Sequence, residues 1–479
     1  MKLHTLTIKA LRARLAAKDI TPAELVNDLL QRIAAIDPQI HGYLRLNPAD
    51  ALRQAATADI SLPLGGIPIA IKDNIAVRGE GCTCASRLLE HYTSPFDATV
   101  IRKLKAVGAI LLGRANMDEF AMGSSTEYSA FGRTRNPWDF ARIPGGSSGG
   151  SAAVVAADEA IAALGTDTGG SIRQPAAFCG CVGLKPTYGR VSRYGAVAFA
   201  SSLDQIGPLT KTVADAALLL NIISGYDELE NTSRPVPVPD FTATLSAGIK
   251  GLRVGIPKEY FIDGMDAEVL AAVRAAMAWY AANGAELVDI SLPNTEHAIS
   301  VYYIVATAEA SANLARFDGV RYGRRSPDGT DAVNTYSKTR AQGFGSEVKR
   351  RVILGTYVLS SGYYDAYYHR AQKVRQLLRR DFTEAFKQCD VILTPTSPTP
   401  AFKAGEKSDP LSMYLADIFT IAVNLAEVCG ISLPCGFTAN SLPIGLQLIG
   451  PHFGEARLLA AAHAYERAHE WAKRRPGFD

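Results

Sequence analysis

The chain has 479 residues, of which 47% are apolar and 20% are charged. This composition is typical of a folded globular protein and excludes a mainly disordered, collagen-like or coiled-coil chain. Lys and Arg number 50 against 47 Asp and Glu, and a net charge of +3 does not predict a dominant nucleic-acid surface.

Neither a membrane span nor a metal site is expected from the sequence. No apolar run approaches the ~20 residues that a spanning helix needs, and the first residues lack the pattern of a secretory signal. Seven cysteines are too few for a disulfide scaffold. Cys82/Cys84 and Cys179/Cys181 have CxC spacing with no histidine within five residues, so we expect buried thiols rather than metal ligands. A reducing cytoplasm is the expected location.

The predicted elements alternate between helices and strands. Residues 1–36 should form two helices, because Thr21 and Glu24 make a capping box around Pro22, which suits the first helical position. Residues 231–250 are rich in proline and typical of a linker or surface excursion. Alternating strands and helices predict a layered α/β fold. Further helices are predicted at 98–108, 265–282, 346–388 (one long, nearly continuous stretch) and 454–471, and strands at 64–72, 109–113, 252–256, 285–290, 390–400 (running into a Pro-rich loop) and 444–450.

Residues 142–207 are rich in Gly, Ser, Ala and Thr and contain few large apolar side chains. Small residues in such numbers predict tight turns and a close approach of backbone segments. The most informative part is 143–173, IPGGSSGGSAAVVAADEAIAALGTDTGGSIR. A phosphate-binding loop is excluded there, because neither GxxxxGK[ST] nor GxGxxG occurs.

The GxSxG pattern of a hydrolase elbow is formally present at Gly145, Ser147 and Gly149. This pattern is short and arises easily in any segment rich in Gly and Ser. It also requires a late histidine, and His452 and His463, which would have to serve, have no supporting acidic motif. The pattern alone therefore does not identify a histidine-dependent triad.

A third interpretation is a serine nucleophile that works without histidine. Such a site needs a hydroxyl beside backbone donors, a second hydroxyl as proton relay, and a base that can be neutral. The string GTDTGGS places Thr168, Gly169 and Gly170 before Ser171, where backbone N–H groups can converge, and GGSSGGS offers a relay hydroxyl. Lys72 ends an apolar strand and could serve as the base, because burial lowers the pKa of an amine. A solvated strand tip is the other interpretation of this lysine.

Residues 64–210 resemble the amidase signature family in the strings GGIPIAIKDN, GGSSGGSAA, GTDTGGSIRQPA and GLKPTYGRVSRYG. The resemblance implies a single domain over the whole chain, with a large twisted mixed β-sheet covered on both faces by helices. It also implies amide cleavage by a Ser–cis-Ser–Lys triad. On this chain Ser171 corresponds to the nucleophile, Ser147 to the relay serine on a cis peptide bond, and Lys72 to the base, with 168–170 supplying the oxyanion donors.

Further strings resemble one group within this family, the glutaminase subunits of tRNA-dependent amidotransferases. They are MDEFAMGSSTE (117–127), SSLDQIGPLTKTVADAALLL (201–220), EVKRRVILGTYVLSSGYYDAYYHRAQKVR (347–375) and DPLSMYLADIFTIAVNLA (409–426). The resemblance implies glutamine as substrate and a heterotrimer with B and C subunits. The B subunit would use ATP and Mg²⁺ to amidate misacylated Glu-tRNA(Gln), and in many bacteria also Asp-tRNA(Asn). No cofactor is expected on this chain, and tRNA is expected mainly on the partner.

Two charged residues are candidates for glutamine recognition. An α-carboxylate favours a bidentate arginine, and an α-ammonium favours a carboxylate. The resemblance assigns these roles to Arg351 and Asp417, with Arg350 as the alternative to its neighbour. The other interpretation of these positions is a solvated helix face and a surface charge.

Two other functions remain open from the sequence. One is a free-standing amidase for small or aryl amides, which would use the same chemistry without partner subunits. The other is a non-catalytic scaffold, in which the segment rich in Gly and Ser is only structural. Whether Asp-tRNA(Asn) is also a substrate depends on the partner that holds the tRNA.

Overall fold

One mixed sheet of 11 strands runs through the residues that the computed structural model describes, 2–407 and 409–478. From one edge to the other the strands are β1 (Tyr43–Leu46), β3 (Ile110–Ala115), β2 (Pro68–Lys72), β4 (Ala162–Asp167), β6 (Gln205–Thr210), β5 (Val182–Lys185), β10 (Cys429–Phe437), β11 (Pro443–Gly450), β9 (Val391–Pro395), β7 (Arg253–Pro257) and β8 (Glu286–Ile290). In this order β2 runs parallel to both of its neighbours, β3 and β4, and β7 runs parallel to β8 and β9. The strands from β4 to β9 pair in antiparallel fashion.

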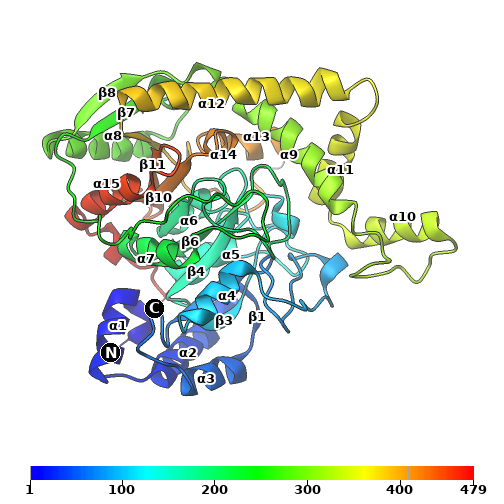
Figure 1. Ribbon diagram of the computed structural model, residues 1–479, viewed down its shortest axis with the longest axis horizontal. Coiled ribbons are helices and arrows are strands. Elements are labelled where there is room, and N and C mark those ends of the chain that lie inside the picture. Colours follow the sequence, from blue (N-terminus) through cyan, green and yellow to red (C-terminus); the bar gives the residue numbers. More distant parts are fainter. Residues whose placement is uncertain (1, 408, 479) are drawn as a thin grey trace.

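Fifteen α-helices accompany the sheet in the described part of the chain. In Figure 1, α12 runs along one side of the molecule, α10 projects from it, and α1 and both termini lie on the opposite side. The helices are α1 (Ile8–Ala17), α2 (Pro22–Ile40), α3 (Pro48–Ala56), α4 (Thr99–Ala106), α5 (Gly149–Ala156), α6 (Arg173–Cys179), α7 (Val213–Ile223), α8 (Ala267–Ala282), α9 (Ala298–Leu314), α10 (Ala332–Gly343), α11 (Ser346–Val358), α12 (Arg370–Gln388), α13 (Pro410–Leu415), α14 (Ile421–Leu425) and α15 (Glu455–Ala468).

Both faces of the sheet are covered. Strands β2 to β6 are buried along their whole length, and successive side chains of a strand point to opposite faces. α5 packs on β2 and β4, α6 on β5, β10 and β11, and α8 and α15 on β10 and β11. These contacts confirm the expected α/β architecture, a large mixed sheet between layers of helices.

Most predicted elements are present. The capping box at the start of α2 is formed by Thr21 and Glu24, and β7, α8 and β8 make the expected parallel βαβ unit. Residues 231–250 contain no helix or strand, in agreement with the linker prediction. None of the helices in the described residues has the length and apolarity that crossing a membrane requires.

The long, nearly continuous helical stretch predicted over 346–388 is present, with one break in the middle. α11 ends at Val358, Gly362 has a φ of 84°, and a π-helical turn at Tyr364–His369 precedes α12. A positive φ is incompatible with continuing an α-helix, and glycine adopts it at little cost. The glycine therefore lies at the break between the two helices of this stretch.

Two regions of this fold carry the candidate site, and we name them here. The catalytic core is residues 64–210, with β2, β4, α5 and α6. The helical layer is residues 298–388, where α9 packs against α11 and α12. Their apolar side chains belong largely to two separate buried clusters, one around the strands of the sheet and one around α9 and α12.

Candidate active site

Two parallel strands end side by side at the centre of the candidate site. Lys72 is the last residue of β2, and Thr166 and Asp167 end β4, its parallel neighbour. Because the carboxyl ends of parallel strands meet at one edge of a sheet, these side chains lie close together. Ser147 and Ser171 each lie two residues before a helix, α5 and α6 respectively. The fold thus brings the three predicted triad residues to one place.

Lys72 is completely buried among hydroxyl groups. Its Nζ lies 2.8 Å from Ser147 Oγ, 2.8 Å from Ser148 Oγ and 2.9 Å from Thr166 Oγ1. The predictions that this lysine is buried and within hydrogen-bond reach of Ser147 are confirmed, and the solvated strand tip is wrong. Ser148 and Thr166 were not identified from the sequence, although both lie within the strings GGSSGGS and GTDTGGS.

Burial sets the protonation of the lysine. It lowers the pKa of Lys72 to about 7, against the opposing charges of Asp118, Asp167 and Asp204. Near neutral pH a large fraction of the amine is therefore uncharged and carries a lone pair. Such an amine can accept a proton from the hydroxyl of Ser147.

The two candidate serines lie on adjacent backbone segments. The Gly146-Ser147 peptide bond is cis, as the resemblance implied. The N–H of Ser148 donates to the carbonyl oxygen of Ser171 at 3.1 Å, which ties the segments together. No hydrogen bond joins the hydroxyls of Ser147 and Ser171 to each other in the described structure, so the expected contact between them is not made in this conformation. The hydroxyl of Ser171 has no protein hydrogen-bond partner among the described residues.

An ion pair fixes the loop that carries Ser171. Asp167 accepts hydrogen bonds from the N–H groups of Gly170 at 2.9 Å and Ile172 at 3.1 Å, and Arg173 binds it through two nitrogens at 3.0 and 3.1 Å. Burial by itself would raise the pKa of Asp167, but the charge of Arg173 holds it at about 2. Asp167 is therefore ionised at all working pH values and keeps the loop in one conformation.

This arrangement refines the predicted oxyanion donors. The N–H of Gly170 is already engaged by Asp167, so it is not an open donor in this conformation. The N–H groups of Thr168 and Gly169 make no hydrogen bond with any described residue, and neither does that of Ser171. Of the three predicted donors, Thr168 and Gly169 therefore remain open and Gly170 does not, because the carboxylate of Asp167 binds the N–H of Gly170.

The two glycines of this loop allow close packing against the helical layer and the segment after α13. A Cβ atom at Gly170, where φ is 136°, would lie 2.2 Å from Thr420 Oγ1, and one at Gly169 would lie 2.8 Å from the ring of Tyr302. The hydroxyl of Thr420 donates to the carbonyl oxygens of Gly169 at 2.6 Å and Asp417 at 3.0 Å. The turn that carries Asp417 is thus fixed beside the nucleophile loop.

Arg351 points into the protein and Arg350 does not. Arg351 is buried, donates to Glu347 at 2.7 Å, and stacks its guanidinium on the rings of Tyr303 and Phe199 at 5.4 and 5.5 Å. Arg350 pairs with the other oxygen of Glu347 and leaves 41% of its side chain exposed. The solvated-face interpretation therefore holds for Arg350 and is wrong for Arg351.

Asp417 is also buried, so the surface-charge interpretation is wrong. One carboxylate oxygen accepts the hydroxyl of Ser124, and the other has no hydrogen-bond partner in the described structure. Burial raises the pKa of Asp417 to about 7, although the hydrogen bond from Ser124 and the charge of Arg351 oppose the shift. A buried carboxylate oxygen without a partner is suited to receive a cationic group of a ligand.

Comparison with known proteins agrees with this geometry. The sequence profile of the Amidase family matches residues 24–459. The chain belongs to the Amidase family. It is 62% identical over 473 residues to the A subunit of glutamyl-tRNA(Gln) amidotransferase from Methylacidiphilum infernorum, covering 98% of this chain and 96% of that protein.

Solved structures show the same similarity. The crystal structure of the A subunit of glutamyl-tRNA(Gln) amidotransferase from Thermotoga maritima has a TM-score of 0.83 and 44% identity, covering 98% of this amidase and 95% of that chain. A 6-aminohexanoate cyclic dimer hydrolase complexed with substrate has a TM-score of 0.86 at 26% identity, covering 99% of each chain. The amidase fold is therefore shared with enzymes whose names indicate different substrates.

Asp118 lies beside Ser147, the predicted relay serine, and was not singled out from the sequence. Its carboxylate accepts the N–H groups of Thr126 at 2.9 Å and Tyr128 at 3.2 Å, and a Cβ atom at Gly146 would lie 2.2 Å from it. Burial raises the pKa of Asp118 to about 6. The string MDEFAMGSSTE, which contains this residue, is a signal that could have found it.

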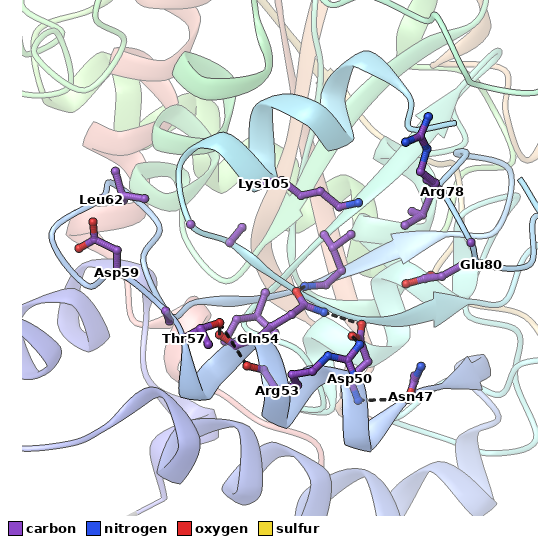
Figure 2. Close-up of a pocket in the computed structure, with 17 residues that line it drawn as sticks. Asn47, Asp50, Arg53, Gln54, Thr57, Asp59, Leu62, Arg78, Glu80 and Lys105 are labelled. Carbon is purple, nitrogen blue, oxygen red and sulfur yellow. Dashed lines mark hydrogen bonds and ion pairs between the residues drawn. The ribbon is translucent and has the colours of Figure 1, made fainter. Parts of the chain in front are cut away.

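Two cavities differ in their relation to the site. One, of about 570 Å³, is lined by Thr166 and Thr168 and extends to Asp204. The other, of about 610 Å³, lies beside α3 among charged side chains such as Arg53 and Lys105, and none of the predicted site residues lines it (Figure 2). Of the two, only the first cavity is lined by a predicted site residue, Thr168, whereas Lys72, Ser147 and Ser171 do not line it.

The cysteines of the amidase are buried thiols, as expected for the two CxC pairs. In the described residues no group of three or more His, Cys, Asp or Glu side chains is arranged to hold a metal ion. The groups that the site offers for chemistry are hydroxyl, amine, carboxylate and guanidinium groups.

Proposed function

We propose that this amidase hydrolyses glutamine as the A subunit of a glutamyl-tRNA(Gln) amidotransferase and passes the ammonia to a partner subunit. One observation carries the proposal. The buried amine of Lys72 lies 2.8 Å from the hydroxyl of Ser147, and Thr420 ties the turn of buried Asp417 to the loop that carries Ser171. Buried Arg351 is the second charged group beside Asp417. The lysine and the serines can cleave an amide, and the pair of Arg351 and Asp417 matches the two charges of an amino acid.

The proposed reaction has two stages. The hydroxyl of Ser171 attacks the side-chain amide carbonyl, and its proton passes through Ser147 to the neutral amine of Lys72. The oxyanion accepts the N–H groups of Thr168 and Gly169. The C–N bond then breaks, the leaving nitrogen takes the proton back, and ammonia departs. Water cleaves the glutamyl ester on Ser171 to release glutamate and restore the hydroxyl.

Substrate selection follows from the paired charges. The guanidinium of Arg351 would bind the α-carboxylate, and the free carboxylate oxygen of Asp417 would bind the α-ammonium. Arg351 already has Glu347 as a counter-charge, so it stays ionised in the empty site. A simple amide without these two charges would leave the free oxygen of Asp417 without a partner and would make no ion pair with Arg351.

The partners and cofactors are part of the same proposal. ATP, Mg²⁺ and misacylated tRNA would bind on the B subunit, with C completing the heterotrimer, because this chain has neither a phosphate-binding loop nor a strongly basic composition. The cavity beside Thr166 and Thr168 is the candidate route for ammonia. We place the complex in the cytoplasm, where aminoacyl-tRNA is used.

The test measures glutamate release and Glu-tRNA(Gln) amidation by the reconstituted complex. Ser171→Ala should lower glutamine hydrolysis by roughly 10⁴-fold or more and leave ammonia-dependent amidation intact. The isolated chain should be poorly active, and turnover should rise on adding B, C, ATP and tRNA. Full turnover by the isolated chain, with no stimulation on assembly, would instead support a free-standing amidase. Unchanged hydrolysis by the alanine variant would contradict the assigned nucleophile.

A further inference from the structure

Gln174 makes two hydrogen bonds that neither the triad nor the substrate pair explains. It lies on α6, three residues after Ser171, and is completely buried. Its side-chain oxygen accepts the N–H of Gly146 at 3.0 Å, and its side-chain nitrogen donates to the carbonyl oxygen of Ser124 at 2.9 Å. One amide group therefore joins three chain segments at the site.

Each hydrogen-bond partner of the Gln174 amide is connected to a group with a proposed role. Gly146 is bonded directly to Ser147, whose hydroxyl lies 2.8 Å from Lys72. The hydroxyl of Ser124 donates to Asp417, the proposed site for the substrate ammonium. A path of alternating hydrogen bonds and covalent bonds thus runs from Ser147, the proposed proton relay, through Gln174 and Ser124 to the carboxylate of Asp417.

We propose that Gln174 is a positioning residue that aligns the relay serine Ser147 with the substrate-binding residue Asp417. This inference rests on the proposed function, since it assumes that both groups act on one glutamine. It predicts that losing the amide misplaces the proton relay and the ammonium site together. Displacement of reacting groups by about 1 Å costs on the order of 100-fold in rate.

An amide is the side chain that fits these two partners. Its oxygen accepts and its NH₂ group donates, as Gly146 and Ser124 require. An ionised glutamate can only accept, so one of its oxygens would face the carbonyl oxygen of Ser124. A protonated glutamate offers one donor and one acceptor and would match again. Methionine fills a similar volume and makes neither hydrogen bond.

Two variants of Gln174 test the role in the reconstituted complex. Gln174→Met should lower kcat for glutamine hydrolysis by roughly 10- to 100-fold and raise KM. The reason is that the segments carrying Ser147 and Ser124 each lose the hydrogen bond that positions them. Gln174→Glu should show an activity relative to wild type that increases as the pH falls, because protonation restores the donor. Gln388→Met, at an exposed position of α12, is the matched control and should equal wild type. Ammonia-dependent amidation should stay unchanged in all three. The Tm should stay unchanged in Gln388→Met and fall by only a few degrees in the two Gln174 variants, because an unpaired buried group costs about 1–3 kcal/mol.

The outcomes separate the two proposals. A wild-type complex that does not hydrolyse glutamine contradicts the proposed function. An active wild type with unchanged kcat and KM in both Gln174 variants contradicts only the positioning role. A fall in Tm and in ammonia-dependent amidation that parallels the glutaminase loss also overturns it, because the residue would then be structural.

Discussion

The catalytic core and the helical layer hold their buried charges differently. In the core, Lys72 lies among three hydroxyl groups and a carbonyl oxygen, all supplied by the protein. In the layer, Arg351 has one carboxylate partner, Glu347, and otherwise contacts aromatic rings. Asp417, on the segment packed beside the layer, keeps one oxygen without a partner. The amine proposed to accept the proton is thus satisfied by the protein itself, whereas the carboxylate proposed to recognise the ligand keeps an oxygen free for it.

The largest effect is expected from breaking the core. Lys72→Arg should lower glutamine hydrolysis by roughly 10⁴-fold, because a guanidinium stays charged at neutral pH and cannot accept the proton of Ser147. Ammonia-dependent amidation by the complex should continue, since free ammonia bypasses this site. Lys105→Arg, on the surface, is the control and should match wild type. Glutaminase activity near the wild-type level in Lys72→Arg would exclude the lysine as base.

The core was more predictable from the sequence than the layer, for a physical reason. Lys72 stands in a local string, GGIPIAIKDN, whose resemblance to the family motif identified it, although the end of an apolar strand by itself also allowed a solvated tip. The choice between Arg350 and Arg351 depends on how α11 is rotated against α9, which local pattern does not reveal. The role of Gln174 depends on a contact with a residue 50 positions away, and the break at Gly362 depends on one backbone angle.

The pH profile of glutamine hydrolysis should report the titration of Lys72 in the catalytic core and of Asp417 beside the helical layer. Burial lowers the pKa of Lys72 to about 7 and raises the pKa of Asp417 to about 7. The active lysine is the neutral amine and the active aspartate is the ionised carboxylate, so both work in their deprotonated forms. The value of kcat/KM should therefore rise with pH, by roughly 100-fold between pH 6 and pH 8 if the two titrate independently.

A variant separates the two titrations. Asp417→Asn cannot ionise, so log(kcat/KM) should rise with about half the wild-type slope below pH 6, at a lower absolute level. The measurement is initial glutamate release across the pH range at subsaturating glutamine. A wild-type profile that is flat from pH 6 to pH 8 would contradict the assignment of both groups.

Substrate recognition in the helical layer gives a smaller effect that appears mainly in KM. Arg351→Lys keeps the charge but loses bidentate geometry, which costs about 1.5–3 kcal/mol, so KM for glutamine should rise roughly 10- to 100-fold. Arg350→Lys is the matched control one residue away, and its exposed position predicts little change. The reverse order of effects would assign the α-carboxylate to Arg350.

The smallest effect is expected from Gly362→Ala, and Gly170→Ala is its comparison in the catalytic core, because both glycines have positive φ. At Gly170, φ is 136° and a Cβ atom would lie 2.2 Å from Thr420, whereas at Gly362, φ is 84° and nothing lies within 4 Å of the added atom. Gly362→Ala should therefore cost only the backbone strain of about 1–2 kcal/mol, seen as a slightly lower Tm with unchanged glutamine hydrolysis. Gly170→Ala adds a clash beside the oxyanion donors and should remove most glutaminase activity. Equal losses of activity in the two variants would show that strain alone governs them, and that the close packing of the catalytic core is not what the reaction needs.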